Sequence, residues 1–292
     1  SKRRTRITFT TREGTPDIQP GNIVNISHNE KGKSLGGMVE LTSGNKTTVI
    51  SKHSTWKTGQ ILTTGDHYTI KKSDWRHVYI THARTIKRIE QGKISSIEKI
   101  ILGICKPETP DKLLTRNLRE IKFTQEWLNE SQREAITFAL QQEELAIIKG
   151  PPGSGKTSTI IEILYLMVRQ QKKTLICAPS NQALDNIMKK LIGKEIKMIR
   201  IGNSTKTLEE LDPYSLEEME EQGKQKHTKK NKEDQRRELL KRQDVIFSTI
   251  SKASQESHMA LLGTNHFDIV IVDEAGQAKE IENWLVTNIA PK

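Results

Sequence analysis

The residues best suited to chemistry form the stretch "GPPGSGKT", which occupies Gly150–Thr157 and fits the pattern G-x-x-x-x-G-K-[ST]. The apolar run "LAIIK" precedes it, and "STIIEILYLMVRQ", with apolar residues at helical spacing, follows it. Glycines let the backbone curl so that successive N–H groups face phosphate oxygens, and a helix N-terminus adds partial positive charge. This context predicts a phosphate-binding loop rather than an ordinary turn.

Each residue type in the loop has a separate task. We expect Lys156 to lie against the β- and γ-phosphates of a nucleotide and the Thr157 hydroxyl to ligate Mg²⁺. The residues predicted to surround the nucleotide are Gly150, Pro151, Pro152, Gly153, Ser154, Gly155, Lys156, Thr157 and Ser158. A dinucleotide fingerprint would need a further glycine after Gly155, and none follows at that spacing, so a hydride-transfer cofactor is not expected.

A second chemical feature lies near the other end of the chain. The stretch "FDIVIVDE" ends in Asp273 and Glu274, directly after four branched apolar residues. A carboxylate at the end of a buried strand can hold the water shell of Mg²⁺, and its neighbour can polarise an attacking water. Such a pair alone indicates an ordinary strand end. With a phosphate loop upstream in the same predicted sheet, Asp273 becomes a predicted metal ligand, and Asp273, Glu274 and Lys156 become predicted catalytic residues.

The elements that must position these residues follow from the periodicity. From about residue 122 onward, short β-branched apolar runs alternate with helical patterns, which predicts an α/β domain with a parallel sheet. The predicted strands are "LAIIKG", "KTLICAP", "KMIRIG", "DVIFST" and "FDIVIVDE". The first seventy or so residues instead alternate apolar and polar in short runs between turn signals, which predicts a small antiparallel sheet or barrel.

Two helical patterns, at about 75–89 and 94–102, connect these regions, and the first can be capped by Ser73-Asp74. Their basic residues, Arg76, Arg84, Lys87 and Arg88, indicate a solvated face. The proline-containing stretch "KPETPDK" at 106–112 then predicts a boundary. The predicted domains are a small β-barrel over 1–73, a helical stalk and linker over 74–111, and a motor domain over 112–292 with a charged insertion at about 205–243.

Composition limits the class of protein. The chain of 292 residues has 47 Lys+Arg against 36 Asp+Glu, a net charge of +11, which suits a partner rich in phosphates but also an ordinary basic protein. Its two cysteines lack CxxC spacing, which favours a reducing compartment, cytoplasmic or nuclear, and disfavours structural zinc. No stretch has the length of a membrane span, so no membrane partner is predicted. Because the sequence begins at Ser1, we expect it to be a segment of a longer chain.

Several motifs together resemble those of superfamily 1 helicases of the nonsense-mediated decay helicase branch. They are "LNESQREAI" at Leu128–Ile136, "CAPSNQALDNI" at Cys177–Ile187, "STIS" at Ser248–Ser251 and "DEAGQA" at Asp273–Ala278. The phrase around the phosphate loop is similar to the immunoglobulin mu-binding protein 2 type. The resemblance implies a RecA-like P-loop NTPase domain preceded by a small antiparallel β-barrel and a helical stalk. It also implies ATP-dependent 5′-to-3′ unwinding of DNA or RNA, single strands as partners, and a second motor domain beyond Lys292.

The resemblance further implies individual roles. Gln132 would read the adenine edge, Gln277 would sense the γ-phosphate, and Pro179, Ser180, Asn181 and Thr249 would contact the nucleic-acid backbone. Ordinary alternatives stay open, because residues 131–134 also form a capping box and Ser and Asn are common helix caps. Two other functional classes also stay open: a nucleic-acid-binding module, and an ATPase that remodels ribonucleoprotein complexes without unwinding. Phosphate contacts cannot choose between DNA and RNA.

Overall fold

The computed structural model separates into two compact units, divided between His77 and Val78. It describes residues 5–11, 18–28, 34–51, 62–72, 76–107, 121–202, 208–224, 232–254, 259–263, 265–287 and 289. The predicted helix cap at 73–74, most of the proline-containing boundary and the basic stretch 225–231 of the charged insertion lie outside the described residues. The predicted limits of the three domains stay a prediction.

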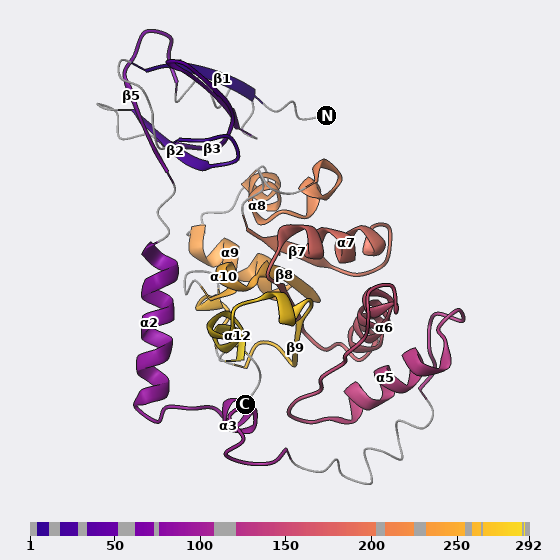
Figure 1. Ribbon diagram of the computed structural model, residues 1–292. Helices are drawn as coiled ribbons and strands as arrows, with labels where there is room; N and C mark the ends of the chain where they lie inside the picture. Colours follow the sequence, from indigo (N-terminus) through magenta and orange to yellow (C-terminus); the bar gives the residue numbers. More distant parts are fainter. Residues whose placement is uncertain are drawn as a thin grey trace. The chain divides into compact units, whose positions relative to one another are not determined.

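The first unit is an antiparallel sheet of five strands in the order β1-β4-β3-β2-β5, seen in indigo and purple in Figure 1. The strands are β1 (Thr5–Thr10), β2 (Ile23–His28), β3 (Ser34–Ser43), β4 (Lys46–Ser51) and β5 (Tyr68–Lys72). Their alternating pattern buries one face, whose core is Val24, Ile26, Leu35, Val39 and Val49. The predicted antiparallel sheet at the N-terminus is therefore confirmed.

The second unit is built on a parallel sheet of four strands in the order β7-β8-β6-β9. The strands are β6 (Thr174–Ala178), β7 (Met198–Ile201), β8 (Val245–Thr249) and β9 (Ile269–Val272). In this register Ala178 lies opposite Thr249, and Cys177 lies opposite Val272. The carboxyl ends of β6, β8 and β9 therefore meet at one edge, and the predicted RecA-like α/β fold class is confirmed.

Helices cover both faces of this sheet (Figure 1). The covering helices are α5 (Glu130–Gln141), α6 (Lys156–Arg169), α7 (Asn181–Leu191), η3 (Glu209–Tyr214), α8 (Leu216–Lys224), α9 (Lys232–Lys241), α10 (Ile250–Ala253) and α12 (Glu280–Thr287). The short helix η4 (Ala275–Gln277) is exposed. Alternate residues of β6 face opposite sides, so Ile176 packs with α6 and α7 while Leu175 packs with α8 to α12. This two-sided burial explains why the strands are apolar throughout.

One predicted strand is wrong. Residues 145–150, "LAIIKG", form no ladder with any described strand, and Ile147 is 76% exposed. Ile148 does pack against the same apolar cluster as Ile269 and Ile271 of β9. An apolar β-branched run favours an extended backbone, but a strand also needs a neighbour at hydrogen-bonding distance, which the run itself does not encode.

The stalk helices α2 (Arg76–Glu90) and α3 (Ser96–Ile101) are joined by a buried carboxylate. Glu98 is fully buried and accepts hydrogen bonds from both terminal nitrogens of Arg88, from the Ser95 N–H at 2.7 Å and from the Thr287 hydroxyl at 3.2 Å. The expected solvated face is therefore wrong for Arg88. A buried charge must be paired, and this pairing ties α2 and α3 to α12.

We expect the Glu98 carboxylate to stabilise the second unit in a pH-dependent way. Burial alone would raise the pKa of Glu98, but hydrogen bonds from Arg88 and Ser95 outweigh it, so the pKa is lowered from the ordinary 4.5. This stabilisation is present above pH 4.5 and is lost as the pH falls through the lower folded-state pKa. Glu98→Gln should reduce the free energy of unfolding at neutral pH by about 1.5–3 kcal/mol, measured by urea denaturation.

The matched control is Glu90→Gln, at an exposed position at the end of α2. The control should change stability by less than about 0.5 kcal/mol, as surface substitutions usually do. Equal effects of the two variants, or a Glu98→Gln effect that does not shrink in acid, would contradict a buried ion pair at this point.

Candidate nucleotide and nucleic-acid site

The phosphate loop has a backbone that only glycine accommodates easily at two positions. Gly153 and Gly155 have φ angles of 79° and 84°, in the left-handed region. At Gly150 a Cβ atom would lie 2.5 Å from the Ser154 Oγ, so this glycine is needed for a close approach instead. The Ser154 N–H donates to the Pro151 carbonyl at 3.3 Å, which closes the turn. The predicted glycine-dependent loop is thus found directly before α6.

Lys156 is the first residue of α6, and its side chain folds back over the loop. Its Nζ donates to the Gly150 carbonyl at 2.9 Å and the Pro151 carbonyl at 3.2 Å. Its positive charge also favours the ionised form of Asp273, the residue directly after β9. The predicted lysine and the predicted carboxylate therefore interact electrostatically.

Gln132 links α5 to the phosphate loop. Its Nε2 donates to the Ser154 carbonyl at 3.2 Å, while its Oε1 accepts from the Asn129 N–H at 3.1 Å. The Asn129 side chain in turn accepts from the Gln132 N–H, so these two residues form the capping box. The capping box predicted at 131–134 is wrong because α5 is capped by Asn129 and begins at Glu130, two residues earlier than that pattern requires.

A buried carboxylate fixes the segment that leads into α5. Glu162 of α6 is fully buried and accepts from the Thr124 N–H and hydroxyl and from the Gln125 Nε2, the last at 2.9 Å. Three hydrogen bonds compensate the loss of water around its charge. No motif in the sequence indicates Glu162, but a charge inside the apolar run "STIIEILYLM" is a signal that it must find partners.

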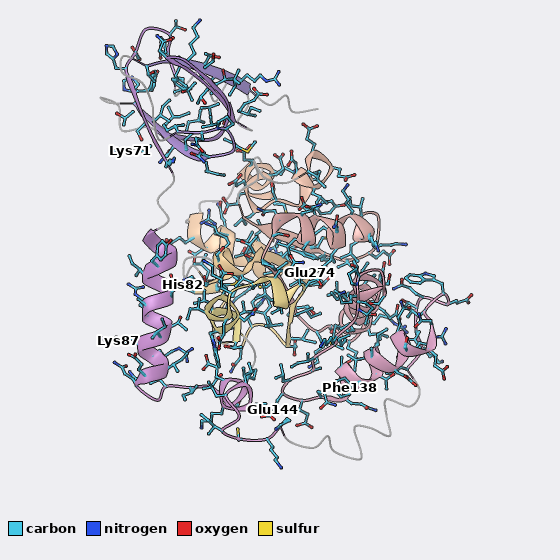
Figure 2. The ribbon with its side chains drawn as sticks, viewed as in Figure 1. Lys71, His82, Lys87, Phe138, Glu144 and Glu274 are labelled. Carbon is cyan, nitrogen blue, oxygen red and sulfur yellow. The ribbon has the colours of Figure 1, made fainter. Side chains whose placement is uncertain are left out.

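The acidic residues lie on a tight turn after β9. The Asp273 N–H donates to the Cys177 carbonyl on β6 at 2.9 Å, and the Asp273 carboxylate accepts from the Glu274 N–H at 3.0 Å. Glu274 has a left-handed φ of 55°, and Figure 2 labels it at the end of β9. Gln277 donates from Nε2 to the Glu274 Oε2 at 2.9 Å. The two predicted catalytic side chains Glu274 and Gln277 are therefore in direct contact.

The charge on Asp273 is disfavoured. Asp273 is only 9% exposed, and this burial, followed by repulsion from Glu274, raises the pKa of its carboxyl above the ordinary 3.8. The positive charge of Lys156 opposes the rise. A cation bound at this point would favour the ionised form of Asp273, because it would offset the repulsion between the two carboxylates.

The residues predicted to contact nucleic acid follow the same edge of the sheet. Pro179 and Ser180 come directly after β6, and the Ser180 Oγ caps α7 by accepting from the Ala183 N–H at 3.1 Å. Thr249 ends β8 and precedes α10, with no side-chain cap bond. Ala178 lies level with Thr249, and Cys177 lies level with Val272, so both segments lie at the same edge of the sheet as the turn that carries Asp273. The segment after β6 is adjacent to that turn, whereas Thr249 is one strand further away. The helix-cap alternative is thus true of Ser180, whereas Asn181 accepts a hydrogen bond from Arg200.

The loop residues fit a nucleotide with Mg²⁺. Gly155 leaves no room for a side chain, since a Cβ atom there would lie 2.1 Å from the Gln132 Nε2. The N–H groups of the first turn of α6 have no partners within the helix, as at any helix start. Among the described residues, the hydroxyls of Thr157 and Ser158 in that turn also make no hydrogen bond to protein. Together these donors and hydroxyls match the oxygens of phosphate and the coordination of Mg²⁺.

A phosphate loop at the start of a helix, beside an acidic strand end in a parallel sheet, defines a P-loop nucleoside triphosphatase domain. The family described as "AAA domain" matches this chain over residues 127–236 and 218–288. These matches cover more than half of the chain, and the chain belongs to this AAA-domain family. The family is one of nucleotide-binding domains, so the nucleotide is a shared property of its members.

Three relatives indicate the branch. The DNA-binding protein SMUBP-2 of Mesocricetus auratus is 34% identical over 246 residues, which are 71% of this chain and 24% of that protein. The DNA polymerase alpha-associated DNA helicase A of Schizosaccharomyces pombe is 32% identical over 57% of this chain and 30% of its own length. The regulator of nonsense transcripts 1 homolog of Arabidopsis thaliana is 31% identical over 53% of this chain and 14% of its own length.

These similarities confirm the predicted resemblance to superfamily 1 helicases of the nonsense-mediated decay branch. The chain spans about a quarter of the length of the first of these relatives, at 24%. In the part of the chain that the structure describes, no helix has both the length and the apolar character needed to cross a membrane.

The raised pKa of Asp273 predicts that its ionised carboxylate destabilises the folded chain when no Mg²⁺ is bound. Because the folded state favours the protonated form, ionised Asp273 costs stability as the pH rises from 3.8 through the folded-state pKa. Asp273→Asn should therefore raise the unfolding midpoint at neutral pH without Mg²⁺, by roughly 2–4 °C. Thermal unfolding followed by circular dichroism measures this change.

Asp268→Asn is the matched control, because the same substitution there should have the opposite sign. Burial would raise the pKa of Asp268, but bonds from the Lys173 N–H and the Lys172 ammonium outweigh it, so the pKa is lowered. Asp268→Asn should thus lower the midpoint. Two variants that shift the midpoint in the same direction would contradict the electrostatic account of Asp273.

Proposed function

We propose that this chain is part of an ATP-dependent helicase that moves 5′ to 3′ on single-stranded DNA or RNA, and that it supplies the first motor domain. The observation that carries the proposal is the shared sheet edge. Asp273, Thr249 and the segment after Ala178 lie at the same ends of three paired strands, and the charge of Lys156 acts on Asp273. This arrangement supports coupling between a nucleotide and a bound strand, since both would contact the same layer of the protein.

In the proposed mechanism the chain binds and orients ATP. Lys156 would leave the carbonyls of Gly150 and Pro151 for the β- and γ-phosphates, and loop N–H groups would hold the remaining oxygens. Thr157 and Asp273 would hold Mg²⁺, which when bound neutralises charge that develops on the phosphates. Gly150, Pro151, Pro152, Gly153, Ser154, Gly155, Thr157 and Ser158 would line the phosphates.

Hydrolysis would depend on the turn after β9. Glu274 would accept a proton from the attacking water, and Gln277, bonded to the Glu274 Oε2 at 2.9 Å, would fix its carboxylate. If Gln277 bonded the γ-phosphate, it would lose its hydrogen bond to Glu274. The orientation of Glu274 would therefore depend on the nucleotide state.

The proposed nucleic-acid contacts are made by Pro179, Ser180, Asn181 and Thr249. Ser180 is exposed before α7, Asn181 is half-buried in its first turn, and N–H groups at a helix start together with an amide suit phosphate oxygens without reading base identity. The net charge of +11 supports an affinity that falls steeply with salt. DNA and RNA would be distinguished by ATPase stimulation with matched strands.

A helicase site of this kind also needs an arginine finger, and none of the residues assigned above has that role. An arginine finger contributes about 10³ to 10⁵ in rate. We therefore propose that a second motor domain supplies such groups and that this chain alone binds ATP but hydrolyses it slowly. A cytoplasmic or nuclear location, and the domain limits 1–73, 74–111 and 112–292, remain part of the proposal.

Nucleotide binding by the chain tests the role of Lys156. Lys156→Ala should weaken binding of a fluorescent ATP analogue with Mg²⁺ by about 10- to 100-fold, the value of a hydrogen bond to a charged group. Lys149→Ala removes the same charge from an exposed position just before the loop and should change affinity less than about twofold, as expected for a screened surface charge. Equal affinity of the wild type and Lys156→Ala would overturn the nucleotide site.

A glycine pair tests the role of Gln132. Gly153 and Gly155 have similar positive φ angles, but only a Cβ at Gly155 meets the Gln132 Nε2. Gly155→Ala should therefore displace Gln132 and reduce the preference for ATP over GTP by about tenfold, the value of one specific hydrogen bond. Gly153→Ala should weaken both nucleotides alike. Competition of ATP and GTP with the fluorescent analogue measures both, and an unchanged preference in Gly155→Ala would remove Gln132 from base recognition.

A further inference from the structure

Arg200 is a charged residue in the middle of a buried strand. It lies on β7, in the run "MIRI", and is only 2% exposed. Burial lowers the pKa of its guanidinium, which remains charged at any physiological pH, while attraction to Asp185 opposes the shift. None of the roles assigned above uses this residue. Removing such a charge from water costs free energy that its partners must offset, so the partners indicate what the residue stabilises.

The partners of Arg200 all lie on one face of α7. Nη1 donates to the Asp185 Oδ1, which is itself buried, and lies 3.9 Å from the Met188 sulfur. Nη2 donates to the Asn181 Oδ1 at 2.7 Å. Positions 181, 185 and 188 follow helical spacing, so the guanidinium lies along the inner face of α7. The two terminal nitrogens thus hold two different residues at once.

This contact fixes the orientation of the Asn181 amide. A guanidinium has donors only, so the atom that it contacts must be the amide oxygen and not the nitrogen. The Asn181 Nδ2 then points away from Arg200. Among the described residues, this nitrogen has no protein partner, and Asn181 stands in the first turn of α7, next to the exposed Ser180. Its two N–H donors are therefore available to an acceptor outside the protein.

We propose that Arg200 is a positioning residue for nucleic-acid binding. Anchored by Asp185, it holds the Asn181 amide so that its donors face the backbone phosphates of a single strand. This inference rests on the proposed function, because it takes the start of α7 as the strand-binding surface. It assigns the buried pair a task beyond stability: a free amide could present either its oxygen or its nitrogen, and only the nitrogen attracts phosphate.

Fluorescence anisotropy of a labelled single-stranded oligonucleotide, at low salt and with the whole chain, tests this assignment. Asn181→Ala should weaken binding about tenfold, as loss of a hydrogen bond to a charged group does. Arg200→Lys keeps the charge and can reach Asp185, but one ammonium cannot reproduce the fixed fork to both partners. It should therefore also weaken binding about tenfold, and the double variant should lose no more than either single variant.

Additivity separates positioning from a purely structural role. If the two effects multiply to about a hundredfold, Arg200 acts independently of Asn181 and the inference is overturned. The same holds if Arg200→Lys binds like the wild type. If the wild type binds no labelled strand, the proposed nucleic-acid function fails for this chain and the inference fails with it. Unchanged binding of the fluorescent ATP analogue identifies variants that keep the fold.

Asn181→Asp provides a test that leaves Arg200 intact, in case Arg200→Lys does not fold. An aspartate still accepts from Arg200 but presents an oxygen outward, so binding should fall well below that of Asn181→Ala. Asn186→Asp adds the same negative charge at an exposed position on the same helix and measures the general electrostatic effect. Equal losses from the two aspartates would overturn the inference.

Discussion

The positions of Asp273, Thr249 and the segment that begins at Pro179 depend on the register of β6 with its two neighbours. Cys177 lies opposite Val272 and accepts from the Asp273 N–H, while Ala178 lies opposite Thr249. All three strands run parallel, so the residues that follow them are brought to one edge. A shift of one residue would move each side chain to the other face of the sheet and separate the acidic turn from the other segments.

Two charges inside apolar elements determine how the surrounding segments are held. Glu162, in α6, holds the segment that leads into α5 through Thr124 and Gln125. Arg200, in β7, holds the start of α7 through Asp185. Burying an unpaired charge costs far more than a hydrogen bond contributes, so each charge constrains its neighbours strongly. The segment that leads into α5 and the start of α7 are thus each held to the core by one buried charged residue.

The stalk shows that the same physics operates outside the site. Arg88 reaches Glu98, and Glu98 accepts from Thr287 on α12, the helix that follows the acidic turn. A basic helix would be read from its sequence as a solvated surface. The contact with a fully buried carboxylate instead makes one of its arginines part of the packing of the second unit.

Local pattern was enough for most of the strands and for the phosphate loop, because both depend on residues close in sequence. The glycines within 150–155 indicate positions where the backbone leaves no room for a side chain or has a positive φ. The apolar runs of β6 to β9 indicate strands that are buried on both faces. The run at 145–150 was assigned wrongly, since strand pairing depends on a distant neighbour. The capping box was misplaced for a related reason: several residues near Gln132 could cap a helix, and packing decided where α5 begins.

The sequence by itself determined the chemistry of the nucleotide site, because the motif at Gly150–Thr157 and the pair Asp273-Glu274 carry that chemistry in adjacent residues. Only the tertiary structure decided which side chains hold them in place. Arg200 and Asn181 are distant in sequence, and their contact exists only because β7 and α7 pack together. A hydrogen bond depends on distance and direction in space, and neither is encoded in the spacing of residues along the chain.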